Sequence, residues 1–333
     1  MWLVAGYLYL IWPYPSMLPF AALLGSSLSL ATPGINLYNP QNVDIYSAIV
    51  IALLLGFVHG ITPDEHTWPI TFSYAIGNFS TRKGAEAGLV FSLGFTVQRA
   101  IMSEAFYFIF NYGLFSIRDF IQSNTFFALV YFLVGLAMGI AGYYVKYGRF
   151  YPHLELNRLL RGKKGQFEHK HEDFYKKNVS NKMAIIHGLI AGFGMGAFAL
   201  IIFTVLAPKM PSPYLGFLPG AIFGIGTMVT QVAIGAVFGT AMRMKKLTEK
   251  ALQFLARYIS SSVLLYGGLV FMFAGLISLI FPQILSLGIS TGIGVYNINS
   301  IDMGLLLVIV TVGIIGIFSY ITGIRLVRKK YLS

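Results

Sequence analysis

Apolar runs of about 20 residues recur along the whole chain, and they constrain its fold more than any other feature. Eight runs are found, at residues 2–24, 45–78, 85–112, 124–145, 183–207, 214–240, 259–283 and 303–326. Each is long enough for a helix to cross the hydrocarbon core of a bilayer. Only 11% of the 333 residues are charged, whereas a soluble domain carries about 25%. We therefore predict an all-α polytopic membrane protein with about eight transmembrane helices.

Lysine and arginine are distributed very unevenly between the loops. Four stretches hold 21 of the 24 basic residues, namely 81–84, 146–182, 241–258 and 325–333. The other connecting loops hold only Arg118 and Lys209. Since loops rich in lysine and arginine stay in the cytoplasm, eight helices place both termini there. This orientation explains most of the net charge of +12, so a nucleic-acid partner is not expected.

Residue types that are absent exclude two further kinds of chemistry. The chain has no cysteine, which rules out disulfides, thiolate metal sites and dithiol redox reactions. It also lacks the G-x-x-x-x-G-K-[S/T] sequence, so it does not hydrolyse ATP by a P-loop mechanism. Any transport activity would then be secondary transport without ATP.

Two pairs of short segments repeat with nearly equal spacing. Residues 56–61 match residues 184–189 at an offset of 128, and residues 97–101 match residues 230–234 at an offset of 133. These matches indicate a duplicated unit of three helices. In the predicted orientation the helix that holds residues 56–61 runs from outside to inside, and the helix that holds residues 184–189 runs from inside to outside. The two repeats are therefore inverted. Inverted repeats are common in secondary transporters, which hold substrate between the halves near the middle of the bilayer.

These observations give an expected organisation for a single transmembrane domain, 1–333. Residues 1–44 hold a first helix, which we expect to be retained and not cleaved, and an external loop. The remaining parts are repeat 1 at 45–145, a basic cytoplasmic loop at 146–182, repeat 2 at 183–283, and a last external loop, helix and basic C-terminus at 284–333.

The richest polar cluster within an apolar run is His59-Gly60-Ile61-Thr62-Pro63-Asp64-Glu65-His66. On a continuous helix the two histidines would be about 10.5 Å apart along the axis. That is too far for one metal ion, whose bonds to imidazole are about 2 Å long. Gly60 and Pro63 allow the helix to end and restart, and Thr62-Pro63-Asp64-Glu65 fits a capping box with Thr62 as N-cap. We expect two half-helices, 46–59 and 63–78, joined by an unwound bend.

Ionisable side chains are costly within a membrane span, so the two histidines and two acids of this cluster indicate a functional site. Imidazole suits Ni, Co, Zn or Fe, and carboxylates offset the charge of a dication. The predicted metal ligands are His59, Asp64, Glu65 and His66. A proton relay and a purely structural helix cap remain open as alternatives.

The same cluster, followed by Gly88-Leu89-Val90-Phe91-Ser92-Leu93-Gly94, resembles the nickel/cobalt transporter (NiCoT) family and its wider superfamily. The second helix of that family carries H-A-x-D-A-D-H or H-A-L-E-P-D-H, and F-S-L-G-H opens the third. The resemblance implies movement of Ni2+ or Co2+ across a prokaryotic inner membrane. It also implies that His59, Asp64 and His66 are ligands, with Glu65 as an inserted one.

The chain differs from the family pattern at several positions. One extra residue precedes His66, and Gly60 replaces the alanine of the family. Thr62 stands at the position of the first signature acid, and Phe95 stands where the third-helix histidine would be. These differences concern metal identity more than fold.

Other polar residues within the runs are candidates for gating or proton coupling, namely Gln98, Arg99, Glu104 and Gln231. Arg99 could neutralise Asp64 or Glu65 until a cation arrives, or it could form a fixed structural ion pair. Glu104 is a candidate proton carrier. Gln231 is the repeat mate of Gln98.

His187 mirrors His59 in the repeat, and it is therefore a further candidate metal ligand. The glycines that follow it, at positions 192, 194 and 196, are expected to permit close helix packing. In the basic loop, residues 168–173 (Glu-His-Lys-His-Glu-Asp) fit a solvated segment or a weak metal-collecting patch.

We conclude from the sequence that the chain is a secondary transporter of a divalent transition metal, with Ni2+ or Co2+ favoured, and not an enzyme. It would work by alternating access, with the metal ion as substrate and the bilayer as its environment. Two other classes remain open. One is an exporter of a small anion or amino acid that uses Arg99 and half-helix N-termini. The other is a non-transporting membrane subunit or intramembrane metalloenzyme. The chain lacks the H-E-x-x-H spacing that is typical of zinc-dependent hydrolases, which makes this class the least favoured.

Overall fold

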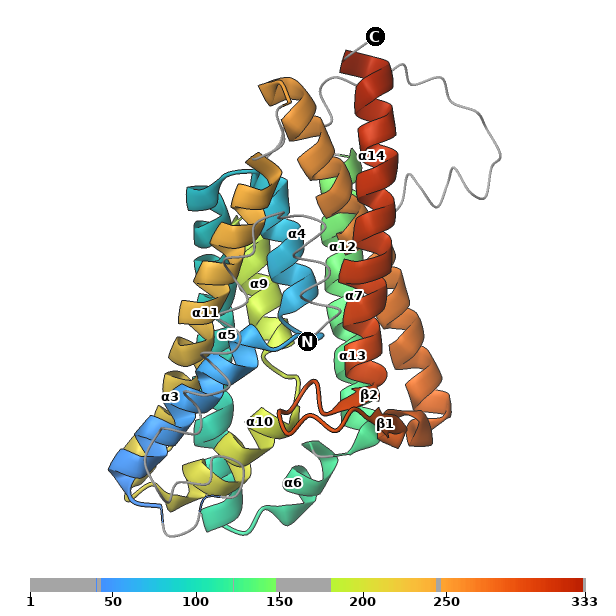
Figure 1. The fold of residues 1–333 in the computed structure, drawn as a ribbon. Coiled ribbons are helices and arrows are strands. Elements are labelled where there is room, and N and C mark those ends of the chain that lie inside the picture. Colours follow the sequence, from blue (N-terminus) through green and yellow to red (C-terminus); the bar gives the residue numbers. More distant parts are fainter. Residues whose placement is uncertain (1–39, 41–42, 122, 148–180, 244–246, 332–333) are drawn as a thin grey trace.

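A computed structural model of the chain is a bundle of helices with one small β-hairpin (Figure 1). It describes residue 40 and residues 43–121, 123–147, 181–243 and 247–331. The α-helices are α3 (Ile45–Ile61), α4 (Trp68–Asn78), α5 (Thr81–Asn111), α6 (Phe115–Ile121), α7 (Asn124–Tyr147), α9 (Asn181–Ala191), α10 (Ala197–Leu200), α11 (Leu218–Arg243), α12 (Glu249–Ile280), α13 (Met303–Val308) and α14 (Gly316–Tyr331). The strands β1 (Gly288–Ser290) and β2 (Ser300–Asp302) pair antiparallel.

Each predicted run that falls in this described part is mainly helical, although two of them are interrupted, and this confirms the all-α class. Four helical segments there are long and apolar enough to cross a membrane: Asn124–Tyr147, Pro213–Met242, Glu249–Ile280 and Met303–Tyr331. The apolar helices Ile45–Ile61 and Ala197–Lys209 are shorter. The run 2–24 and the patch 168–173 lie outside the described residues. The described part thus has the fold of a helical membrane protein, with four segments that could span a bilayer by length and composition.

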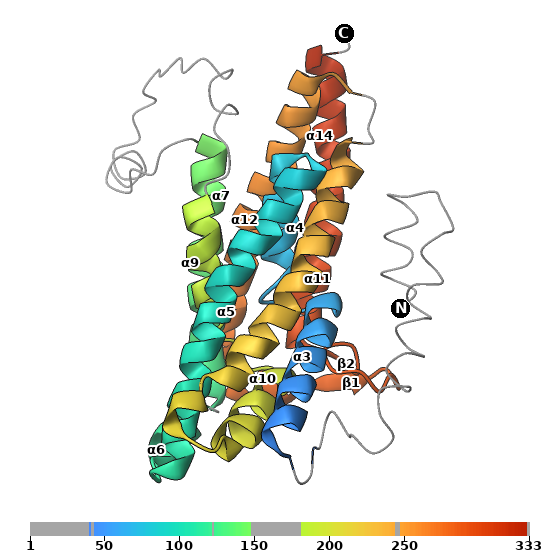
Figure 2. The ribbon, with the colours of Figure 1, turned by 90° about the vertical axis from the view of Figure 1, so that its left-hand side faces the viewer.

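Consecutive long helices run in alternating directions between the two ends of the bundle, seen as upper and lower in Figures 1 and 2. The chain rises through α3 and α4, descends through α5 and rises through α7. It descends again in α9, rises in α11, descends in α12 and rises to the C-terminus in α14. The β-hairpin lies toward the lower end, and the basic last turn of α14 lies at the upper end.

The run 45–78 is broken after His59, as predicted, but the limits of the break differ from the prediction. α3 continues through Gly60 to Ile61, and α4 begins only at Trp68. Gly60 does not end the helix. Its missing side chain instead allows close approach to α11, because a Cβ there would collide with Thr230.

The predicted capping box at Thr62 is wrong. Thr62 is the C-cap of α3, and its hydroxyl lies 2.9 Å from the carbonyl oxygen of Val58 and 3.2 Å from that of His59. Because this hydroxyl is directed back to α3, it does not cap the following helix. The proline in the first turn of α4 is Pro69, and the predicted Pro63 lies in the connecting turn.

A second break, which the sequence did not predict, interrupts the run 183–207. α9 ends at Ala191, residues 192–196 are not helical, and α10 is followed by the π-helical turn η3 (Ile201–Leu206) and the 3-10 turn η4 (Ala207–Lys209). The close packing expected at the glycines occurs at Gly192, against Gln98, and at Gly194, against His66. Gly196 has open space around it.

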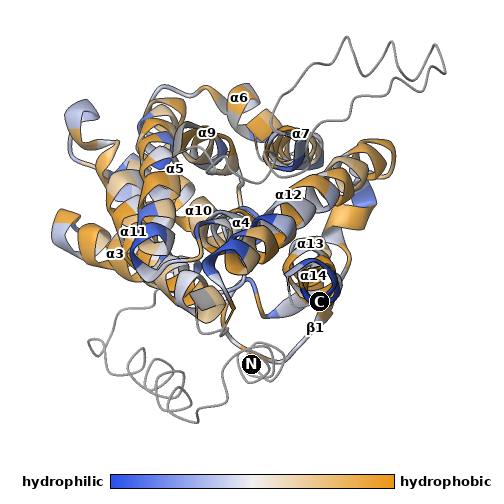
Figure 3. Cartoon of the chain, turned by 90° about the horizontal axis from the view of Figure 1, so that it is seen from above, coloured by the Kyte–Doolittle hydropathy of each residue, from blue (hydrophilic) through white to orange (hydrophobic). Residues whose placement is uncertain are grey.

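α5 and α11 form the central packing of the bundle. Their backbones meet at Gly84 and Gly235 and again at Gly88 and Gln231, so the two helices are antiparallel. The absence of side chains at these glycines allows the close approach, as is common between membrane helices. Seen from above, hydrophobic residues cover much of the outer helices, and hydrophilic residues are most evident around α4 and the end of α14 (Figure 3).

α5 and α11 also each pack against one half-helix of a broken segment, and in both cases the half-helix comes from the other predicted repeat. Gly60 of α3 meets Thr230 of α11, and Gly188 of α9 meets Phe91 of α5. The two interrupted segments therefore contact their neighbours in a reciprocal way.

Candidate metal centre between the half-helices

The turn between α3 and α4 brings together three of the predicted ligands. Asp64 organises this turn, because its Oδ1 accepts a hydrogen bond from the backbone amide of His66 at 2.9 Å. Ligand atoms of Asp64, Glu65 and His66 all lie within 4.8 Å of one another. Nδ1 of His66 is 3.1 Å from Oε1 of Glu65 and 3.8 Å from Oδ1 of Asp64. We call these three residues the Asp64 group.

His59 reaches this group from the last turn of α3. Its Nδ1 lies 3.7 Å from Oδ2 of Asp64, so the Asp64 carboxylate lies between two imidazoles. Both nitrogens of His59, and Nε2 of His66, are buried without a hydrogen-bond partner among the described residues. The two residues are only 4% and 3% exposed. Buried polar atoms usually have a partner, so these three nitrogens are candidates to contact a ligand.

Aromatic rings surround the imidazole of His59. It stacks on Phe95 and Phe223, with ring centroids 5.6 and 5.1 Å away, and it contacts the edge of Phe198 at 5.7 Å. Phe95 stands where the NiCoT family has its third-helix histidine, so this position borders the candidate site in our chain. The aromatic wall keeps the His59 side of the site apolar.

Residues from three other elements complete the surroundings of Glu65 and His66. Tyr131 of α7 donates to Oε1 of Glu65 at 3.1 Å, and its ring stacks on His66. A Cβ on Gly194 would lie 2.6 Å from the His66 ring, and one on Gly304 would lie 2.6 Å from Oε2 of Glu65. The sequence did not single out Tyr131 or Gly304, because nothing in local spacing reveals a contact between distant segments.

Asn297 approaches from the loop between the two strands. Its side-chain amide donates to Oδ2 of Asp64 at 3.3 Å and to the hydroxyl of Thr62 at 3.2 Å. This residue was also missed from the sequence, since its loop carries no charge cluster or repeat.

The two repeat-mate glutamines lie beside the two helix breaks, but their bonding differs. Gln231 donates through Nε2 to the carbonyl oxygen of Gly60 at 2.8 Å, and Oε1 accepts from Thr71 at 2.6 Å. Gln98 lies against Gly192 at the second break, and both polar atoms of its amide are buried without a hydrogen-bond partner in the described part of the chain.

Arg99 makes no ion pair with Asp64 or Glu65 within 4.0 Å. Its guanidinium instead lies 4.6 Å from the ring centre of Phe95, one of the rings that also contact His59. Cation–π contact with such rings is favourable in a site that excludes water. The residue is 2% exposed, and its Nε and Nη1 have no hydrogen-bond partner among the residues that the structure describes.

The other two candidates lie outside the Asp64 group. Nδ1 of His187 is 2.8 Å from the hydroxyl of Tyr74 in α4. Glu104 lies against Gly216, and its Oε2 is buried with no hydrogen-bond partner in the described part. The predicted roles of both residues stay predictions.

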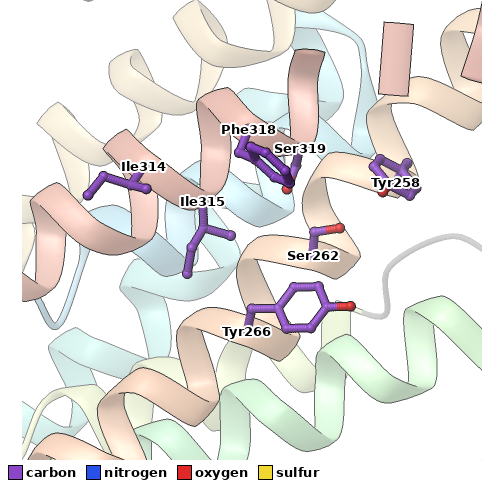
Figure 4. A pocket seen from close by; sticks show the side chains of 7 residues that line it. All are labelled: Tyr258, Ser262, Tyr266, Ile314, Ile315, Phe318 and Ser319. Atoms are coloured by element: carbon purple, nitrogen blue, oxygen red, sulfur yellow. The ribbon is translucent and has the colours of Figure 1, made fainter. Parts of the chain in front are cut away.

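A hollow of about 340 Å³ between α12 and the last helix is separate in its lining from the Asp64 group (Figure 4). Its lining is mostly apolar or aromatic, with two serines, Ser262 and Ser319. It offers no carboxylate or imidazole to a cation.

No protein-family model, curated protein or solved structure matches the chain. The resemblance to the nickel/cobalt transporters therefore depends on the motifs in residues 59–94.

Proposed function

We propose that the chain is a secondary transporter of a divalent transition-metal cation, with Ni2+ or Co2+ as its preferred substrate. The observation that carries this proposal is the convergence of His59 on the Asp64 group at a break in a membrane helix. His59 and His66 supply neutral nitrogen, and Asp64 and Glu65 supply negative charge.

The chemistry of these donors suits a borderline metal ion. Imidazole nitrogen binds Ni, Co, Zn and Fe, whereas Mg2+ and Ca2+ prefer sets of oxygen ligands. Oε1 of Glu65 and Oδ1 of Asp64 lie 3.1 and 3.8 Å from Nδ1 of His66, so this nitrogen and the two carboxylates are the donors that face one another. The motif resemblance favours Ni2+ and Co2+ within this group.

The arrangement of the two interrupted segments supports transport by alternating access. The two segments run in opposite directions. α3 of the first segment packs against α11, and α9 of the second segment packs against α5. Such reciprocal packing is what an inverted repeat, 45–145 and 183–283, would produce. Motion of one half relative to the other would then expose the cation to either side. We propose eight spans in a prokaryotic inner membrane, with both termini in the cytoplasm.

The test is metal binding and flux with purified protein. Ni2+ and Co2+ binding is measured by calorimetry, and uptake is measured in proteoliposomes. The double variant His59→Gln/His66→Gln should lose binding and flux, because it removes both nitrogen ligands. His187→Gln is measured in parallel, because this buried histidine contacts Tyr74 outside the Asp64 group. Weaker binding in this variant would support its predicted role as a ligand, and unchanged binding would limit the nitrogen ligands to His59 and His66. Unchanged flux in the double variant would overturn the proposal.

A second candidate, export of a small anion or amino acid, is favoured by one observation. The buried guanidinium of Arg99 has two nitrogens without a hydrogen-bond partner among the described residues, and these could bind a carboxylate or an inorganic anion. Transport of a labelled anion that Ni2+ does not affect would support this candidate against the metal transporter.

A further inference from the structure

The loop between β1 and β2 reaches the candidate metal centre through the side chain of Asn297. Residues 288 and 302 pair at the base of this hairpin, and the loop places Asn297 at Asp64 and Thr62. Oδ2 of Asp64 therefore faces Nδ1 of His59 and the amide of Asn297 at the same time.

Neighbouring contacts hold the hairpin in this position. Tyr296 packs edge-on against Phe198, a ring that itself contacts His59. Just after β2, Gly304 lies directly against the carboxylate of Glu65. The hairpin and the start of α13 thus border both acids of the site, so Asn297 is not an isolated surface contact.

The backbone at Asn297 narrows the side chains that this position accepts. Its φ of 68° lies in the left-handed region, which asparagine, aspartate and glycine adopt more readily than other residues. Of these three, asparagine can both donate a hydrogen bond to a carboxylate and offer a neutral carbonyl oxygen to a cation, whereas an ionised aspartate only accepts and glycine has no side-chain polar group.

We propose that Asn297 is a substrate-binding residue of the metal centre, supplied by the hairpin. In the structure its amide donates a hydrogen bond to Oδ2 of Asp64. A bound cation would be coordinated by this same oxygen. When a cation binds Asp64, rotation of the amide presents its carbonyl oxygen to the ion. No bond is made or broken covalently in this exchange. The inference depends on the proposed function, since it names a further ligand of the same site.

The experiment uses the full chain in detergent, titrated with Ni2+ and separately with Co2+. Calorimetry gives Kd, and stopped-flow mixing with a chelator gives the dissociation rate. Asn297→Gly keeps the left-handed backbone but removes the amide, and it should weaken binding by about tenfold to a hundredfold, the usual range for losing a group that supports a metal site. Dissociation should accelerate in the same variant.

Two other variants make the interpretation specific. Asn297→Asp adds a carboxylate beside Asp64, so it should lower the thermal stability of the protein without metal and enlarge the stabilisation that Ni2+ produces. Asn299→Gly introduces the same backbone freedom two residues away in the same loop and should bind as the wild type does.

The outcomes separate this inference from the function on which it depends. If the wild type binds metal and Asn297→Gly binds it equally well, only the role of Asn297 is overturned. The same conclusion follows if Asn299→Gly weakens binding as much as Asn297→Gly does. A wild-type protein without saturable Ni2+ or Co2+ binding overturns both the role and the proposed function. Weakening in Asn297→Gly only, with the larger metal-induced stabilisation in Asn297→Asp, supports the role.

Discussion

Gln231 of α11 donates through its Nε2 to the carbonyl oxygen of Gly60, at 2.8 Å, one residue before α3 ends. The last carbonyls of any helix lack partners within the helix, and in a membrane such groups are costly. Gln231 also accepts a hydrogen bond from Thr71 of α4. The Gln231 side chain therefore links both half-helices, α3 and α4, to α11 and fixes their relative position at the break.

Replacement of Gln231 by leucine should destabilise the protein. The change leaves the Gly60 carbonyl and the Thr71 hydroxyl buried without this partner, at a cost of about 1–3 kcal/mol. Thermal unfolding in detergent would detect the loss as a lower melting temperature. The matched variant is Gln98→Leu, which removes an amide that has no hydrogen-bond partner in the described part and should leave stability unchanged or higher. Equal losses in both variants would contradict the asymmetry between the two breaks.

Gly194→Ala should disrupt the metal centre although Gly194 is not a ligand. The added Cβ would lie 2.6 Å from the His66 ring, so the imidazole must move. We expect Ni2+ affinity to fall by about tenfold or more, as when a residue that orients a ligand is lost. Calorimetric titration measures this change.

A nearby glycine provides the comparison for that substitution. Gly196 lies in the same non-helical stretch, but nothing lies within 4 Å of the position of its Cβ. Gly196→Ala should therefore bind metal as the wild type does. If both variants lost affinity equally, general rigidity of residues 192–196 would be the cause, and contact with His66 would not.

Apolar runs were sufficient to predict where the long helices of the described part lie, because length and hydrophobicity decide where a membrane helix lies. The run 214–240 became α11, Leu218–Arg243, and the run 124–145 became α7, Asn124–Tyr147. The presence of a break after His59 also followed from its polar residues. Its limits did not, because Thr62 can bond to carbonyls before it or to amides after it, and the local sequence fits both.

Contacts between distant segments were beyond the reach of the sequence. Asp64, Glu65 and His66 are adjacent in the chain, so their grouping could be predicted from position alone. Tyr131 and Asn297 join them from residues far along the chain, and only the packed structure brings them together. The second break was missed because glycines favour close packing and helix interruption equally.

Tyr131→Phe tests how Glu65 is held beside His66. The variant keeps the ring that stacks on His66 but removes the hydroxyl that donates to Oε1 of Glu65. Loss of one such hydrogen bond costs about 1 kcal/mol, so Ni2+ affinity should fall about fivefold. Tyr74→Phe removes a comparable buried hydroxyl, at His187, and should leave the affinity unchanged. An unaltered Kd in Tyr131→Phe would show that Glu65 keeps its position without the tyrosine.

Membrane orientation can be tested directly because the chain has no cysteine of its own. Gly294→Cys places a thiol in the loop between β1 and β2, where no atom lies within 4 Å of the added Cβ. Lys329→Cys places one in the basic last turn of α14. Since loops rich in lysine and arginine stay in the cytoplasm, the two thiols should lie on opposite sides. A membrane-impermeant maleimide should label Gly294→Cys in intact cells and Lys329→Cys only after permeabilisation. The reverse pattern would invert the proposed topology, and labelling of both in intact cells would contradict the assignment of the two ends to opposite sides.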